Sequence, residues 1–390
     1  MHNGDQVFTR CNAENKRRSQ GDENRVDALK VGIVGSGWMG HVHSRAWRSN
    51  APRAEVVAIA DVSPDRTRAL ASQFRDREVT TYSNLATMLA EADLDAVDIC
   101  LPHHLHAEAI LIAARAGKAI LCEKPLCTAL DDAVAIRNAL QESGATFMAA
   151  HNQLFQPSLM EARRLLASGA LGRTFVVRSI EAVQNRGIRT GAVPRELDGG
   201  ESPWSWRVDP QRMGGGEVID TGWHATYRLL ALAEDRPVEV TALMDRFAVK
   251  QLTTEDTGVL LVRFASGVIG EIFTSWAFNP VGGWHFEVAA EHGSLAGGKA
   301  RLVHQLHGWP EPVEFTKFPD DLPATFASEI THFLDVVQEG ATPQASFDHA
   351  ARVLQLTLAA YTAAAEHCVV ALPEDPTQPG VPAVAAELTR

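Results

Sequence analysis

The sequence of 390 residues has little cysteine and no long hydrophobic run. The cysteines are odd in number, no two of them have C-x-x-C spacing, and they stand at Cys11, Cys100, Cys122, Cys127 and Cys368. This pattern argues against a disulfide framework and against zinc, and it favours a reducing compartment, the cytoplasm. No apolar stretch approaches the ~20 residues of a membrane span. Residues 1–28 have no apolar segment typical of a secretory signal and are expected to form a disordered leader.

The chain also lacks an excess of positive charge. It has 36 Lys and Arg against 48 Asp and Glu, a formal net charge of −12. Partners that are recognised through bulk negative charge, such as nucleic acid or an anionic membrane, are therefore not expected. A hydrophobic content of 45% is ordinary for a globular protein. Because 390 residues exceed one usual core, two domains are expected.

Short apolar segments alternate with helix-period segments between residues 29 and 151. The expected strands are Leu29–Val34, Glu55–Ala60, Ala96–Leu101, Ala119–Cys122 and Thr146–Ala150. The expected helices lie near 39–50, 65–74, 105–117 and 129–143. This alternation predicts parallel βαβ units, and hence an α/β domain with a doubly wound sheet that helices cover on both faces.

The pattern changes after residue 151. The expected strands there are longer and alternate in polarity: Phe175–Val183, Val238–Phe247, Thr257–Phe264, Val268–Trp276 and His285–Ala290. The expected helices are 158–168, 217–234, 325–339 and 347–366. Residues 152–370 are therefore predicted to form an α+β domain with a large, mostly antiparallel sheet that is open on one face. The Pro- and Ala-rich residues 371–390 are interpreted as a tail.

A G-x-G-x-x-G motif follows the first expected strand and opens a helix. Its residues are Gly35, Ser36, Gly37, Trp38, Met39 and Gly40. In this context the glycines allow a tight turn and close approach of a pyrophosphate to the helix N-terminus, which predicts a Rossmann domain that binds NAD(P).

Asp61 ends the second strand, 21 residues after Gly40, where a carboxylate meets the ribose hydroxyls of the adenosine. A 2′-phosphate would be repelled there, so NAD is predicted over NADP. Asp61 could instead only cap the helix that follows Ser63, and Arg66 lies close enough to reduce its charge.

Two further motifs carry candidate chemistry. Lys124, between Glu123 and a proline, follows an expected strand, and ligands of open parallel sheets bind beyond the carboxyl ends of strands. Asp220 and His224 follow three glycines and are spaced i, i+4, so that they share a helix face. A carboxylate beside an imidazole can orient it for proton transfer. Taken alone, Lys124 could simply be a solvent-exposed side chain at the end of a strand. Asp220 and His224 could likewise be an ion pair on the surface of a helix.

Together these motifs resemble the Gfo/Idh/MocA oxidoreductases. The resemblance rests on G-x-G-x-M-G-x-x-H, then E-K-P, then G-G-G-x-x-x-D-x-G-x-H, in that order between about residues 30 and 370. His43, Pro102, His106, Asn152 and the pair Trp206-Arg207 also fit it. It implies hydride transfer between a secondary alcohol of a sugar, polyol or glycoside and nicotinamide C4. It also implies homodimers or homotetramers that form through the second-domain sheet.

The resemblance also implies roles for individual residues. Lys124, Asp220 and His224 would be catalytic: His224 the general base, Asp220 its orienting partner or the reverse, and Lys124 the group that stabilises the alkoxide. The Lys124–Pro125 bond is a candidate cis peptide. The expected cofactor-binding residues are Gly35, Ser36, Gly37, Trp38, Met39, Gly40, Asp61, Arg66, Leu101, Pro102, His103, His106, Glu123, Lys124 and Asn152. The expected substrate-binding residues are Lys124, Asn152, Trp206, Arg207, Asp220 and His224.

Some residues depart from the family pattern. His103 replaces the usual Asn, Tyr227 replaces a frequent Asp, and Leu154 stands where Arg is common. These changes border the substrate side and weaken inference to one substrate. No metal is expected at His103, His104 and His106, and His41 and His43 are interpreted as packing and capping residues.

Two other functions remain open at this point. The same residues could serve a glycoside-cleaving enzyme that uses NAD for a transient oxidation. The fold could also carry a non-catalytic sensor of sugar or nucleotide, although such a protein need not keep Lys124, Asp220 and His224.

Overall fold

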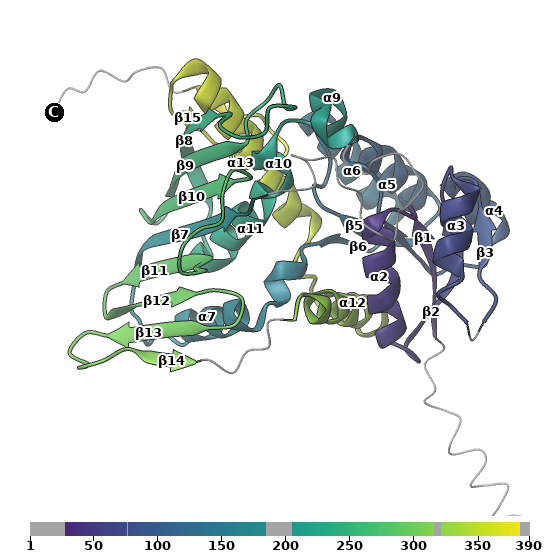
Figure 1. The fold of residues 1–390 in the computed structure, drawn as a ribbon, viewed down its shortest axis with the longest axis horizontal. Coiled ribbons are helices and arrows are strands. Elements are labelled where there is room, and N and C mark those ends of the chain that lie inside the picture. The colour runs from purple at the N-terminus through teal and green to yellow at the C-terminus, as the bar shows by residue number, and fades with distance from the viewer. Residues whose placement is uncertain (1–27, 76, 185–204, 316–320, 383–390) are drawn as a thin grey trace, which may run out of the picture.

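The computed structural model describes residues 28–75, 77–184, 205–315 and 321–382. It contains two sheets, each with its own covering helices, which lie side by side (Figure 1). The expected leader, apart from Ala28, lies outside the described residues. None of the described helices is both long and apolar enough to cross a membrane.

The first sheet has six parallel strands in the order β3-β2-β1-β4-β5-β6. The strands are β1 (Leu29–Val34), β2 (Ala54–Ala60), β3 (Thr80–Tyr82), β4 (Ala96–Ile99), β5 (Ala119–Glu123) and β6 (Phe147–Ala150). The helices are α2 (Trp38–Ser49), α3 (Pro64–Ala71), α4 (Leu85–Glu91), α5 (His106–Arg115) and α6 (Leu130–Ser143). Every residue of β4, β5 and β6 is buried, as expected for strands covered on both faces. The predicted doubly wound sheet is confirmed.

The second sheet has ten strands in the order β14-β13-β12-β11-β7-β10-β9-β8-β15-β16. They are β7 (Thr174–Ala182), β8 (Pro237–Asp245), β9 (Thr257–Phe264), β10 (Ile269–Ser275), β11 (Phe286–Ala290), β12 (Gly293–Gly297), β13 (Leu302–Leu306), β14 (Val313–Phe315), β15 (Val370–Ala371) and β16 (Val381–Pro382). Among the described strands of this second sheet, only β7 and β10 pair in parallel, so the predicted, mostly antiparallel sheet is confirmed.

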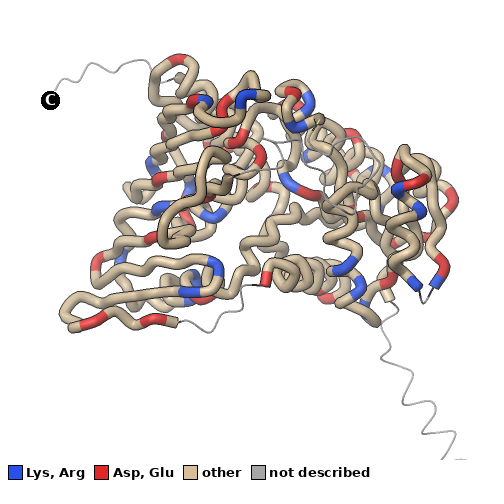
Figure 2. Tube along the Cα trace, in the orientation of Figure 1, with Lys and Arg blue, Asp and Glu red and all other residues tan. Residues whose placement is uncertain are grey.

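One face of this sheet is covered and the other is open. The covering helices are α7 (Pro157–Ala167), α11 (Gly222–Ala233) and α13 (Phe347–Glu366). On the open face Leu243 is 76% exposed and Leu261 49% exposed. Arg178 on this face forms ion pairs with Glu271 and Glu287, at 2.9 and 3.2 Å. Basic and acidic residues intermingle along both halves of the chain (Figure 2).

The structure corrects two details of the predicted organisation. The expected tail from 371 includes β16 and the second residue of β15, because β15 pairs with β8 and β16 with β15. The helix predicted over 217–234 is divided at Thr221 into α10 (Glu217–Asp220) and α11.

The chain returns to the first sheet before it ends. Helix α12 (Leu322–Glu339) packs against α2, where Phe333 meets Trp47 edge to face with ring centroids 6.1 Å apart. Arg53 Nη1 forms an ion pair with Asp335 at 2.7 Å, and the Ala149 N–H donates to the carbonyl of Ala345. The junction between the halves is therefore built from packed side chains as well as from the connection after β6.

Candidate active site

The glycine-rich segment lies between β1 and α2. Gly35 has φ of +101°, and a Cβ on it would lie 2.4 Å from the Cys100 carbonyl oxygen. A Cβ on Gly40 would lie 2.1 Å from the Gly35 carbonyl oxygen, whereas one on Gly37 would meet nothing within 4 Å. Helix α2 begins there with no side-chain cap, so no capping side chain takes up the amides of its first turn. This backbone fits the pyrophosphate of a dinucleotide.

Asp61 holds the same loop. Its Oδ2 accepts from the Ser36 N–H at 2.8 Å, and its Oδ1 accepts from the Ser63 N–H at 2.8 Å and from Arg66 Nη2 at 2.9 Å. Asp61 therefore holds both the fingerprint loop and the start of α3, as the capping interpretation expects, while its contact with a ribose stays a prediction. A carboxylate has about four acceptor sites, so one remains for a ribose hydroxyl. Trp38 and Met39, the next two residues of the motif after Gly37, are exposed and partly buried, respectively.

Lys124 and Asp220 bring the two halves of the chain together. Lys124 Nζ donates to Asp220 Oδ1 at 2.5 Å and to the Asp220 carbonyl at 2.9 Å. Arg207 Nε donates to the other carboxylate oxygen at 2.9 Å. Burial would raise the pKa of Asp220, but Lys124 and Arg207 hold this pKa well below its ordinary value. Asp220 is thus a buried carboxylate ion that fixes the two cations beside it.

His103 and Trp206 line the same cluster. The Arg207 guanidinium lies over the Trp206 ring, 4.3 Å from its centroid, and Trp206 meets His103 edge to face at 4.6 Å. His103 Nδ1 lies 3.0 Å from the Met213 carbonyl, and its Nε2 lies 3.6 Å from Asp220 Oδ1. Burial lowers the pKa of His103 well below its ordinary value, so the ring is neutral, donates from Nδ1 and turns an unprotonated Nε2 toward Asp220.

His224 has a different partner from the predicted one. Its Nδ1 lies 2.7 Å from the Tyr227 hydroxyl, whereas the carboxylate of Asp220 pairs with Lys124 and Arg207. The prediction that Asp220 orients His224 is therefore not supported by these contacts. Burial and the charge of Lys124 lower the pKa of His224 to about 4. His224 is thus neutral at physiological pH, and the residue as a whole is only partly buried.

The three glycines before α10 allow the loop to pack closely on its neighbours. A Cβ on Gly216 would lie 2.2 Å from the Glu255 carbonyl oxygen. The Glu255 carboxylate accepts from the Val218 N–H at 2.9 Å and from the Tyr361 hydroxyl at 2.7 Å. These bonds fix the start of α10 and so the position of Asp220. Glu255 was not predicted, and nothing in its local pattern indicated this role.

A buried network lies behind Lys124. His43 of α2 has Nδ1 2.9 Å from Asp98 Oδ2 and Nε2 3.1 Å from Glu123 Oε1, and Glu123 Oε2 accepts from the Lys124 N–H at 2.9 Å. Burial lowers the pKa of His43, but the Asp98 carboxylate outweighs it and raises this pKa well above its ordinary value. His43 is therefore an imidazolium that holds the backbone of the E-K-P motif, a larger role than the predicted packing. Asp98 within an apolar strand was the sequence signal for a buried partner.

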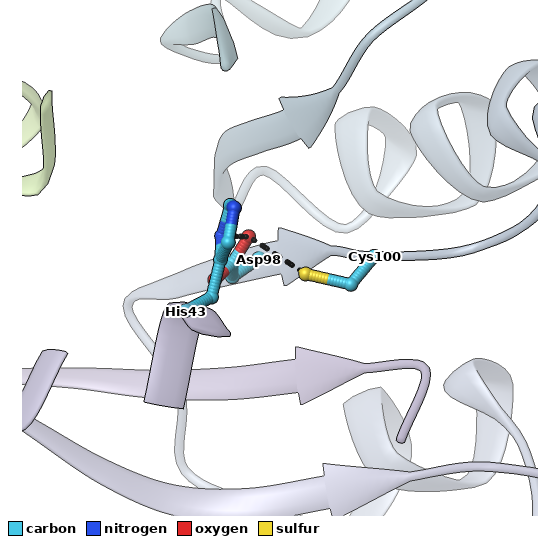
Figure 3. A group of neighbouring side chains, drawn as sticks. All are labelled: His43, Asp98 and Cys100. Carbon is cyan, nitrogen blue, oxygen red and sulfur yellow. Dashed lines mark hydrogen bonds and ion pairs between the residues drawn. The ribbon is translucent and has the colours of Figure 1, made fainter. Parts of the chain in front are cut away.

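His43, Asp98 and Cys100 also have the donor types of a metal site, and their ligand atoms lie within 4.8 Å of one another (Figure 3). Metal binding requires an unprotonated imidazole nitrogen and a thiolate. Both nitrogens of His43 contact carboxylates instead. Burial raises the pKa of Cys100, which keeps it a thiol. The donor set therefore fits a hydrogen-bond network better than a metal ion.

Two predicted site residues have structural contacts. His106 begins α5 as expected, and its two ring nitrogens lie 2.6 and 2.8 Å from the carbonyls of Pro125 and Leu101, which joins the loops after β4 and β5. In the loop after β4, Pro102 directly precedes the short 3₁₀ turn that begins at His103. Asn152 is buried, and its amide donates to Thr325 of α12 at 3.0 Å. The Lys124–Pro125 peptide is cis, as predicted.

Comparison with known proteins decides the family. Residues 29–151 match the "Oxidoreductase family, NAD-binding Rossmann fold", and residues 159–296 match the "GFO/IDH/MocA C-terminal domain". The chain is 31% identical over 272 residues to a 1,5-anhydro-D-fructose reductase of Ensifer adhaerens, covering 68% of this chain and 74% of the relative. The chain belongs to the Gfo/Idh/MocA oxidoreductase family.

Other members of the Gfo/Idh/MocA family cover more of the chain. An inositol 2-dehydrogenase of Rhizobium meliloti (strain 1021) is 29% identical over 346 residues, 87% of this chain and 97% of the relative. A solved levoglucosan dehydrogenase in complex with NADH and levoglucosan has the same fold, with a TM-score of 0.80 at 23% identity over 89% of this chain and 100% of that chain. The predicted two-domain NAD(P)-binding oxidoreductase is thereby confirmed.

Proposed function

We propose that this Gfo/Idh/MocA member is an NAD-dependent dehydrogenase that interconverts a secondary alcohol of a sugar, polyol or glycoside with the corresponding ketone. The observation that supports this best is the convergence of Lys124, from the nucleotide-binding half, with Asp220 and His224 of the second half. The names of the relatives above, a reductase and dehydrogenases of carbohydrates and polyols, support the substrate class.

The residues would divide the work as follows. The loop Gly35–Gly40 and Asp61 would hold NAD, which would supply the hydride acceptor. The alcohol proton must leave with the hydride, because the product is a neutral ketone. Of the three N–H donors of Lys124, two go to Asp220, so one is free for the reacting hydroxyl. His224 would contact the same hydroxyl through Nε2. Trp206 and Arg207 would border the rest of the substrate.

The same arrangement accounts for an alkoxide-like transition state. A cation whose position is already fixed stabilises developing negative charge without reorganising. Asp220 provides this fixation, since it binds Lys124 and Arg207 at once. Burial of the cluster strengthens these interactions because fewer water molecules screen them.

The preference for NAD over NADP is proposed from Asp61. Replacement Asp61→Ala removes a charged acceptor for the ribose, which is typically worth about 1.5–3 kcal/mol. We expect the ratio of kcat/KM for NAD over that for NADP to fall at least about tenfold, or ~1.4 kcal/mol. Arg66→Ala is the matched control, because it removes the cation beside the same site and should lower use of NADP. An unchanged cofactor ratio in Asp61→Ala would refute the ribose contact.

We also propose a homodimer or homotetramer formed through the open face of the second sheet. Leu243, Leu261 and Ile269 are 76%, 49% and 47% exposed on neighbouring strands of this sheet. Light scattering on the purified chain should give at least twice the mass of one chain. The substitution Leu261→Arg should lower this measured mass toward that of one chain. A monomer at micromolar concentration would exclude this assembly.

The cytoplasm is proposed as the compartment, because the four cysteines in the described part of the chain are free thiols.

The direct test of the activity is NADH formation over a panel of sugars, inositols, anhydrosugars and glycosides. We expect stoichiometric NADH with at least one of them, and NAD formation when the ketone and NADH are supplied. Cleavage of a glycoside with no net NADH would favour the glycoside-cleaving alternative, and no reaction with any compound would contradict the proposal.

A further inference from the structure

The hydrogen bonds around Tyr227 determine which nitrogen of His224 carries the proton. The Tyr227 hydroxyl accepts from the Gln153 N–H at 3.2 Å and lies 2.7 Å from His224 Nδ1. Tyr227 is fully buried, and in the described part of the chain its hydroxyl has no other partner. Its own proton therefore has one acceptor available, His224 Nδ1.

The alternative arrangement leaves a buried proton without an acceptor. If His224 carried its proton on Nδ1, the hydroxyl would accept from both His224 and Gln153, and its O–H would be unsatisfied. A buried donor without a partner costs about 1–3 kcal/mol. Donation from Tyr227 to Nδ1 satisfies every group, and it leaves the proton of the neutral imidazole on Nε2.

Tyr227 is also held in place as a ring. It stacks on His151 with centroids 4.4 Å apart and planes 14° apart. His151 is fixed in turn, because Trp223 Nε1 donates to its Nε2 at 2.9 Å. The hydroxyl thus has little freedom to turn away from His224.

We propose that Tyr227 is a positioning residue that keeps His224 in the Nε2–H form, so that His224 acts as a neutral hydrogen-bond donor to the reacting oxygen and Lys124 exchanges the proton. This inference rests on the proposed function. In alcohol oxidation, the Lys124 ammonium first releases to water the one proton that Asp220 does not accept, and its amine then takes the O–H proton as the C–H hydride leaves for NAD and the C=O bond forms. In reduction, the Lys124 ammonium returns that proton to the oxygen. His224 stabilises the negative charge in both directions without changing its own protonation.

The surroundings of His224 favour the neutral ring. Burial is the largest effect, and with the charge of Lys124 it lowers the pKa of His224 to about 4, while Glu181 opposes it. Tyr227 is no competing acid, because burial raises its pKa well above the ordinary value. The titratable and charged groups that act on His224 or border it are Lys124, Glu123, Glu181, His151, Tyr227 and Arg228.

The first test observes directly which ring nitrogen of His224 carries the proton, and it does not depend on catalytic turnover. The full chain is labelled with ¹⁵N-histidine, and the His224 signals are assigned by their loss in His224→Gln. We expect Nε2 protonated and Nδ1 unprotonated at pH 7, with and without NAD. In Tyr227→Asp, a carboxylate replaces the phenol and should draw the proton to Nδ1 and raise the pKa of His224. A wild-type ring protonated on Nδ1 would overturn the proposal, even if Tyr227→Asp does not fold.

The second test compares two amides in place of His224. Gln can place an N–H near the position of Nε2, and Asn places one near Nδ1, but neither can accept a proton as a base. Loss of a donor to a developing oxyanion costs about 10²–10³-fold, so His224→Gln should keep at least about tenfold more kcat than His224→Asn. Equal, severe loss in both would show that His224 is the base.

A third variant separates packing from donation. Tyr227→Phe keeps the ring that stacks on His151 and removes the hydroxyl alone. If Tyr227 acts through His224, the ¹⁵N shift of His224 Nδ1 and kcat change in Tyr227→Phe, and Tyr227→Phe in the His224→Gln background lowers kcat no further. An unchanged Nδ1 shift, or an equal loss in both backgrounds, would refute the positioning role. If the wild type oxidised no compound of the panel, the proposed function would fail while the ¹⁵N result still decided the tautomer.

Discussion

The two halves of the molecule each hold a buried or partly buried histidine, and the two differ in charge: His43 is a cation and His224 is neutral. His43, in the nucleotide-binding half, has carboxylates on both ring nitrogens, and its pKa is raised well above the ordinary value. His224, in the second half, has a phenol on one nitrogen and an ammonium nearby, and its pKa falls to about 4. Burial lowers both pKa values, so the difference comes from the partners alone. The charged histidine serves as a structural link and the neutral one faces the site.

The largest expected effect is on the His43 side. His43→Phe would leave Asp98 and Glu123 buried without their shared cation, and breaking a buried ion pair typically costs about 3–5 kcal/mol. We expect a loss of that size in the free energy of unfolding, measured by urea denaturation. His349→Leu is the control, since His349 Nε2 has no hydrogen-bond partner among the described residues and its loss should cost under about 1 kcal/mol. Similar losses of unfolding free energy in both variants would mean that the ion pairs of His43 with Asp98 and Glu123 add no stability beyond that of an ordinary buried histidine.

The next largest effect is expected at Lys124, whose charge lowers the pKa of His224. Lys124→Met removes a fixed charge and a donor beside the reacting oxygen, so kcat should fall by at least about 10²–10³-fold. The affinity for NADH, followed by fluorescence, should change little. The pKa of His224 should rise, because Lys124 lowers it in the wild type. Unchanged turnover would remove Lys124 from the mechanism.

The smallest effect is expected from pH. An imidazole in an unfolded chain titrates near 6.5, but the depressed pKa of His224 keeps it neutral down to about 4. Between these values the unfolded form binds the proton that the folded form excludes, so this group destabilises the fold as pH falls from about 6.5 toward 4. We expect no change in the His224 ¹⁵N signals between pH 5 and 8. A titration near 6.5 would show that Lys124 and burial do not act as described.

The fold was largely predictable, because long buried strands and amphipathic helices carry clear periodicity. The missed elements are short or exposed, such as β3 and β14, which have three residues each. The packing of α12 on α2 was also not predictable, since nothing local in residues 322–339 specifies a partner more than 270 residues away.

The sequence predicted which residues form the site better than it predicted which of them contact one another. Motif context pointed to Lys124, Asp220 and His224, and the first two do meet. The pairing of Asp220 with His224 rested on helix spacing, but the helix is divided at Thr221 and the carboxylate turns to Lys124 and Arg207. Tyr227 was noticed only as a departure, although its i+3 position from His224 placed it within reach on one helix face.

The return of the chain to α2 bears on how the nucleotide-binding half could be isolated. Trp47 is 1% exposed, and Phe333 of α12 covers one edge of its indole. A truncation after residue 151 would strip this aromatic cover and the partner of Arg53. Such a fragment would present apolar surface to water, so we expect it to aggregate more readily than the full chain although its parallel sheet is complete.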